Sequence, residues 1–144
     1  MTIAGMQELL PKQAWDLLLE RTQDAAEGAG DPPLFVDVRM EIEFRYVGHP
    51  PGAQNIPWYE YPAMAPDPAA FVAVVERAAG SRHRTVVLIC RSGRRARDAG
   101  LALEAAGFGD VVAVVHGFEG DLNEALQRSR TNGWRFDGLP WEQM

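Results

Sequence analysis

Three short, nearly continuous apolar runs constrain the fold of this chain more than any other feature. They cover Leu34–Val38, Thr85–Ile89 and Val111–Val115, and each is rich in β-branched residues. Strands that are covered on both faces show such continuous runs, whereas half-exposed strands alternate between apolar and polar residues. Helix-like patterns lie between the runs. The sequence therefore predicts an α/β fold of three layers, in which these runs are central parallel strands.

Helices are expected in four segments, and proline, aspartate and glycine mark several of their ends. Asp67 is placed to cap the helix that starts at Pro68, and Gly80 is placed to end that helix. The four segments are Pro11 to about Glu20, Pro68 to Gly80, about Arg94 to Ala106, and a shorter one from about Asp121 to Gln127. Residues 21–33 are predicted to form a surface connection, and a short strand is expected near Gln54–Ile56.

The length of 144 residues and a hydrophobic content of 47% predict one globular domain over residues 1–144. Residues 129–144 form an aromatic, glycine-containing extension that we expect to lie across this domain. The net charge of -6 disfavours binding to nucleic acid. No apolar stretch is long enough to span a membrane, and no secretory signal is visible, so the expected location is cytoplasmic. The sequence leaves the oligomeric state open.

The most informative segment is the one that contains Cys90, the single cysteine of the chain. Here an apolar strand runs directly into the loop Cys90-Arg91-Ser92-Gly93 and then into a helix that begins near Arg94 and Arg95. Ligands bind at the carboxyl ends of strands in open α/β sheets. Amides of the loop and of the helix N-terminus can hold an anion and can stabilise a thiolate, and the arginines add positive charge. The alternative is a small buried cysteine beside three solvated arginines.

Two motifs resemble those of the rhodanese-like sulfurtransferases. The first is Cys90-Arg91-Ser92-Gly93-x-Arg95, which is similar to the active-site loop of that family. The second comprises Asp37-Val38-Arg39, Glu43-Phe44 and the run from Gly48 to Pro57, which resembles the upstream signature of the family. The resemblance covers about residues 7–120.

The resemblance implies a rhodanese-like fold with a central five-stranded parallel sheet flanked by helices. It also implies that Cys90 is the nucleophile and carries sulfur as a persulfide. The loop residues Arg91, Ser92, Gly93, Arg94 and Arg95 would then hold an anionic sulfur donor. No cofactor or metal is required for this chemistry.

Two positions depart from the family pattern. Ala96 stands where the family often has serine or threonine, so one hydroxyl near the sulfur is absent. His116 replaces the first glycine of a turn that often reads Gly-Gly, and an imidazole could thereby tune the thiolate. A solvent-facing turn histidine is the other interpretation, and the one we favour.

Asp37 and Arg39 are candidate supporting residues at the end of a buried strand. Asp37 could anchor neighbouring loop amides, and Arg39 could face the anion or pair with a carboxylate such as Glu43. A structural ion pair is the interpretation that we favour. His49 is expected to be structural and His83 exposed, and the scattered histidines give little support to a metal site.

The favoured function is therefore transfer of sulfane sulfur from thiosulfate, or from a persulfide donor, to a thiol, cyanide or protein acceptor. A non-catalytic module that binds a partner through its aromatic tail is the alternative from a different class. A cysteine phosphatase or arsenate reductase is a further alternative, but its loop needs five residues between cysteine and arginine. In this chain only four residues lie between Cys90 and Arg95.

Overall fold

The structure, a computed structural model, describes residues 6–144 and confirms the predicted parallel sheet. Its five strands lie in the order β1-β5-β4-β2-β3, and every neighbouring pair is parallel. They are β1 (Met6–Leu9), β2 (Leu34–Asp37), β3 (Gln54–Asn55), β4 (Val86–Ile89) and β5 (Val111–Val114). The three strands that the sequence predicts form the centre of the sheet because their residues are buried on both faces.

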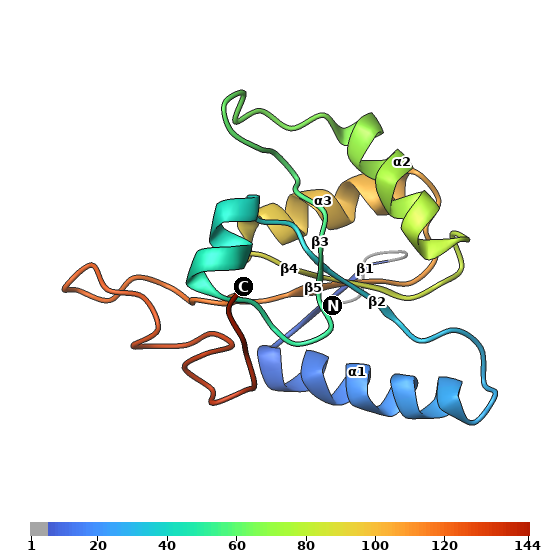
Figure 1. The fold of residues 1–144 in the computed structure, drawn as a ribbon, viewed down its shortest axis with the longest axis horizontal. Helices are drawn as coiled ribbons and strands as arrows, with labels where there is room; N and C mark the ends of the chain where they lie inside the picture. Colours follow the sequence, from blue (N-terminus) through green and yellow to red (C-terminus); the bar gives the residue numbers. More distant parts are fainter. Residues whose placement is uncertain (1–5) are drawn as a thin grey trace.

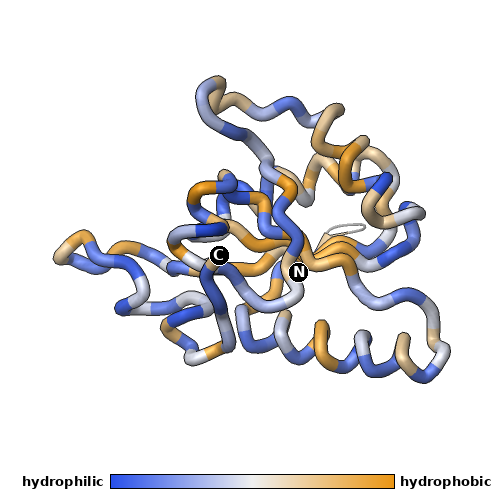
Figure 2. Tube along the Cα trace, viewed as in Figure 1, coloured by the Kyte–Doolittle hydropathy of each residue, from blue (hydrophilic) through white to orange (hydrophobic). Residues whose placement is uncertain are grey.

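Helices cover both faces of this sheet, as a three-layer fold requires (Figure 1). Helix α1 (Pro11–Ala26) lies on one face, and α2 (Pro68–Ala79) and α3 (Arg94–Ala105) lie on the other. The alternation of side chains along β4 divides the core, since Val87 and Ile89 face α1 whereas Val86 and Leu88 face α2 and α3. Figure 2 shows the apolar centre that results.

The ends of α2 are those that the sequence predicts. The Asp67 carboxylate accepts a hydrogen bond from the backbone N–H of Ala70 at 3.2 Å, and Gly80 ends the helix in the left-handed conformation. Helix α3 begins at Arg94 as expected, directly after the Cys90 loop. A single π-helical turn, η1 (Glu43–Val47), follows β2.

Two predictions about helices are wrong. The expected helix from Asp121 to Gln127 is an irregular turn, in which Leu126 has a φ of 58°. Leu122 and Leu126 are 48% and 77% exposed, so the apolar face that a helix would carry here packs against nothing that could stabilise it. The surface connection is also shorter than residues 21–33, because α1 continues to Ala26.

The aromatic extension lies across the domain, as expected. Trp134 is fully buried between α1 and the sheet, where its ring contacts those of Trp15 and Phe35. Its indole N–H donates to the Pro140 carbonyl at 2.7 Å. This extension is therefore part of the core on the α1 side.

Within residues 6–144, no helix has both the length and the apolar character that crossing a membrane requires.

Candidate active site

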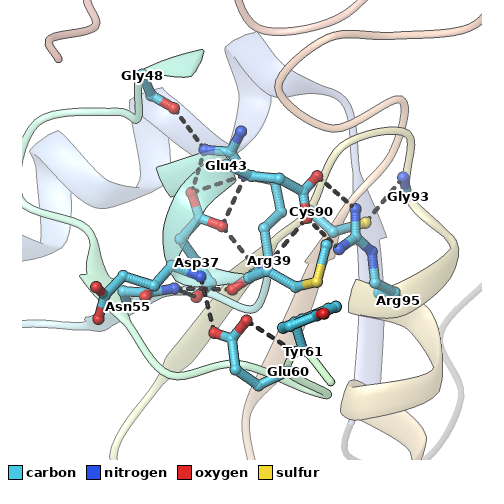
Figure 3. Close-up of polar contacts among 12 residues, drawn as sticks. Asp37, Arg39, Glu43, Gly48, Asn55, Glu60, Tyr61, Cys90, Gly93 and Arg95 are labelled. Atoms are coloured by element: carbon cyan, nitrogen blue, oxygen red, sulfur yellow. Dashed lines mark hydrogen bonds and ion pairs between the residues drawn. The ribbon is translucent and has the colours of Figure 1, made fainter. Parts of the chain in front are cut away.

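Cys90 lies at the carboxyl end of β4, between β2 and β5 at the centre of the sheet. Its side chain is 1% exposed, and its Sγ accepts a hydrogen bond from the backbone N–H of Gly93 at 3.0 Å (Figure 3). Gly93 immediately precedes α3, so this donor belongs to the positive end of the helix dipole. The sequence thus places the sulfur of the cysteine against a backbone donor at the N-terminus of α3.

The back of the Cys90 loop is fixed by the turn that follows β5. The N–H of Phe118 donates to the Cys90 carbonyl at 2.8 Å, and that of Glu119 donates to the Arg91 carbonyl at 2.9 Å. Gly117, with a φ of 64°, lies so close that a Cβ there would come within 2.5 Å of the Cys90 carbonyl oxygen. Two backbone segments therefore meet at a distance that only glycine allows.

Arg95 is held by Glu43 of η1 in a two-point ion pair. Its Nη1 and Nη2 lie 2.7 and 3.0 Å from the two Glu43 carboxylate oxygens, and both side chains are nearly buried, at 12% and 13% exposure (Figure 3). The guanidinium also lies over the Tyr59 ring, 5.3 Å from its centroid. Arg95 is thus locked in one orientation beside the loop.

Burial alone would raise the pKa of Glu43, but the hydrogen bonds and positive charge of Arg95 outweigh it and lower that pKa. Burial likewise opposes the charge on Arg95, whereas Glu43 and, to a smaller extent, Cys90 raise its pKa. Both groups are charged at neutral pH. The sequence did not identify Glu43 as the partner of Arg95, although Glu43-Phe44 is part of the upstream motif.

Asp37 and Arg39 form a second, fully buried ion pair. The Arg39 Nη2 lies 2.7 Å from a carboxylate oxygen of Asp37 and donates to the Gly48 carbonyl at 2.6 Å. Its guanidinium lies 4.7 Å from the centroid of the Phe118 ring. Arg39 therefore faces Asp37 and the turn after β5, and it is Arg95, not Arg39, that pairs with Glu43.

The remaining predicted loop residues lie at the rim. Arg91 and Arg94 are exposed, and Ser92 is half-buried. Ser92, Gly93 and Arg94 line a hollow of ≈ 650 Å³ together with His116. His116 is half-buried, has a φ of 67°, and places its Nδ1 3.5 Å from a carboxylate oxygen of Asp121. The structure thus brings His116 beside the loop.

The other singled-out positions lie away from this rim. Ala96 is fully buried in the core on the α2 and α3 side. His49 is buried, stacks on Phe44 and places its Nδ1 2.8 Å from the Phe44 carbonyl, which agrees with a structural histidine. His83 is exposed. Among residues 6–144, no group of three His, Cys, Asp or Glu side chains could hold a metal ion.

Comparison with known families decides what kind of domain carries this loop. The rhodanese-like domain family matches residues 19–124. This chain belongs to the rhodanese-like family. The matched range includes every predicted site residue of this rhodanese-like domain, from Asp37 to His116, and it ends before the buried Trp134.

Solved structures agree with this assignment. Rv0390 from M. tuberculosis is 29% identical and covers 95% of this chain and 97% of its own, with a TM-score of 0.76. A thiosulfate sulfurtransferase from Pseudomonas aeruginosa, at 18% identity and TM-score 0.61, covers 96% of this chain, which spans 20% of that protein. A polysulfide-sulfur transferase from Wolinella succinogenes has 20% identity and TM-score 0.60, with coverages of 98% and 81%. A search of curated proteins finds no match.

Proposed function

We propose that this rhodanese-like domain is a sulfurtransferase that carries sulfane sulfur as a persulfide on Cys90. The observation that carries the proposal is the hydrogen bond from the Gly93 N–H to the Cys90 Sγ, at 3.0 Å, where the central strand meets the N-terminus of α3. The Gly93 N–H contacts the atom that bears the charge of the thiolate. In a persulfide that charge lies on the outer sulfur, which is bonded directly to Sγ and so stays close to the same helix N-terminus. The same loop can therefore stabilise the free and the loaded enzyme.

The reaction proceeds in two displacements. The Cys90 thiolate attacks the sulfane sulfur of the donor, a new S–S bond forms, and the donor S–S bond breaks. With thiosulfate, sulfite leaves with the electron pair of that bond. An acceptor thiolate or cyanide then attacks the outer sulfur of the persulfide, and the Cys90 thiolate leaves and is regenerated.

The donor that we propose is thiosulfate or another small thiosulfonate-like anion, with a protein persulfide as the alternative. Arg91 and Arg94 are exposed beside the loop and are free to meet a donor's negative charge, whereas Arg95 is engaged by Glu43. Two of the structures that share the fold are named as sulfurtransferases, which supports the reaction class. The acceptor is proposed to be a thiol, cyanide or a protein.

Steady-state transfer of sulfur from thiosulfate to cyanide, and separately to a small thiol, tests the proposal. Wild-type protein is expected to turn over with at least one acceptor, and Cys90→Ser is expected to be inactive, because serine is a far weaker nucleophile towards sulfur. Equal rates for wild type and Cys90→Ser would overturn it. Inactivity of the wild type with thiosulfate and with a persulfide donor would do the same.

A further inference from the structure

A segment outside the matched family range contacts the turn that fixes the Cys90 loop. This segment, residues 134–144, is here termed the brace. The Trp134 N–H donates to the Gly117 carbonyl at 2.8 Å, and the Arg135 N–H donates to the Phe118 carbonyl at 3.2 Å. The brace therefore binds the backbone carbonyls of Gly117 and Phe118. The N–H groups of the residues that directly follow these two bind the carbonyls of Cys90 and Arg91.

Side chains of the brace also enclose the Phe118 ring. The Arg135 guanidinium lies 5.2 Å from the centroid of that ring, and the buried Arg39 guanidinium lies 4.7 Å from it. Trp141 contacts Phe118 edge to face, with ring centroids 6.1 Å apart and an interplanar angle of 85°. Phe118 is fully buried by these contacts, and its own N–H holds the Cys90 carbonyl.

The far end of the brace is attached to the segment that positions Arg95. His49 and Glu142 exchange two backbone hydrogen bonds, of 2.8 and 2.9 Å, and the Met144 N–H donates to the Arg45 carbonyl at 3.0 Å. The Trp141 ring lies so close to Gly48 that a Cβ at Gly48 would come within 2.8 Å of it. Arg45 belongs to η1, the turn whose Glu43 holds Arg95.

The brace thus joins the two segments that support the Cys90 loop. One is the turn after β5, which binds the carbonyls of the loop, and the other is η1, which binds Arg95. Trp141 stands at the junction, because one ring contacts both Phe118 and Gly48. We infer that Trp141 is a positioning residue for sulfur transfer, which sets the place of Cys90 through Phe118. This inference rests on the proposed function, and it assigns the brace a role in the reaction beyond completing the core.

The experiment compares Trp141→Ala with Phe136→Ala in the full chain. Phe136 is the matched control, because it is an aromatic residue of the same segment with 50% exposure, against 44% for Trp141. For Trp141→Ala we expect kcat to fall by about 10- to 100-fold, since small misplacement of a reacting group has effects of this size. The KM for thiosulfate is expected to change little, because the exposed arginines that meet the donor are untouched. Trp141→Phe, which keeps a ring against Phe118, is expected to restore most of kcat.

A readout that does not depend on turnover separates this inference from the proposed function. The backbone amide signals of Cys90, Arg91 and Gly93 in ¹H–¹⁵N NMR spectra are expected to shift in Trp141→Ala and to stay unchanged in Phe136→Ala. Unshifted signals, or a Trp141→Ala kcat equal to that of the control, would overturn the inference. If the wild type transfers no sulfur, the NMR comparison alone decides, and shifted signals still support the positioning role.

A truncated chain that ends at Pro140 gives a second variant. It removes Trp141 and the pairing of Glu142 with His49 but retains the Pro140 carbonyl that Trp134 binds in the core. A folded truncated chain is expected to show the same loss of kcat as Trp141→Ala. Full activity of this chain would contradict the inference.

Discussion

Arg95 and Glu43, 52 residues apart in the sequence, meet beside the Cys90 loop through two hydrogen bonds of 2.7 and 3.0 Å. The pair joins the first turn of α3 to η1, so it fixes the start of the helix that directly follows Gly93. Because the contact needs an ionised Glu43 carboxylate, protonation of that group at low pH weakens it.

Glu43→Gln is expected to lower the free energy of unfolding by about 1–3 kcal/mol near pH 7, because it weakens hydrogen bonds to a charged, nearly buried partner. The pKa of Glu43 is lowered in the folded protein, so ionisation stabilises the fold above the ordinary glutamate pKa of ~4.3. That contribution is lost as pH falls through the lowered folded pKa. Urea titrations of both proteins at a series of pH values measure the difference.

The difference in the free energy of unfolding between wild type and Glu43→Gln should therefore be largest near neutral pH and should decrease below about pH 4. Glu41→Gln is the matched control, because Glu41 pairs with Arg45 at the surface, where both side chains are more than half exposed. It should change stability little at any pH. A Glu43→Gln difference that stays constant down to low pH would show that the pair does not act through charge.

Gly117→Ala is expected to reduce sulfur transfer because the added Cβ would push against the Cys90 and Arg91 backbone. Gly80→Ala is the control: Gly80 has a φ of 79° against 64° for Gly117, but its Cβ would meet nothing within 4 Å. In both variants alanine must adopt a left-handed backbone conformation, which lowers the free energy of unfolding by about 1–2 kcal/mol. Only Gly117→Ala should lower kcat, by about 10- to 100-fold. Similar kcat values in the two variants would show that the close approach is not needed.

The loop geometry also predicts selectivity against phosphate. Four residues separate Cys90 from Arg95, and the Arg95 guanidinium is already occupied by Glu43. A phosphoryl group would lack both the wider ring of amides and the free guanidinium that its oxygens need. We expect no Cys90-dependent hydrolysis of aryl phosphates and no reduction of arsenate. Turnover of an aryl phosphate by the wild type, abolished in Cys90→Ser, would contradict this account.

The sequence predicted the layers and the place of Cys90 because those features leave local signals. Three buried parallel strands produce continuous apolar runs, and a strand that leads into a glycine-containing loop and a helix marks the Cys90 loop. Strand β1 left no comparable signal, since it is a four-residue edge strand in which Gln7 and Glu8 are exposed. The length of α1 was underestimated for a similar reason, because its last turn is mostly exposed and carries no large apolar side chain.

The contacts that position the site could not be predicted from local patterns. The pairing of Glu43 with Arg95 joins two polar loops that are far apart in the chain, and the contacts of Trp141 come from an irregular segment. The predicted helix from Asp121 to Gln127 failed because its apolar spacing met no surface to pack against. Each of these depends on tertiary packing.

Mass spectrometry of the thiosulfate-treated protein tests the central claim most directly. The account predicts that wild-type protein gains one sulfur atom, that the Cys90 peptide carries it, and that a thiol reductant removes it. Cys90→Ser, treated in the same way, should gain nothing. Absence of the adduct after treatment with thiosulfate and with a persulfide donor would contradict the account.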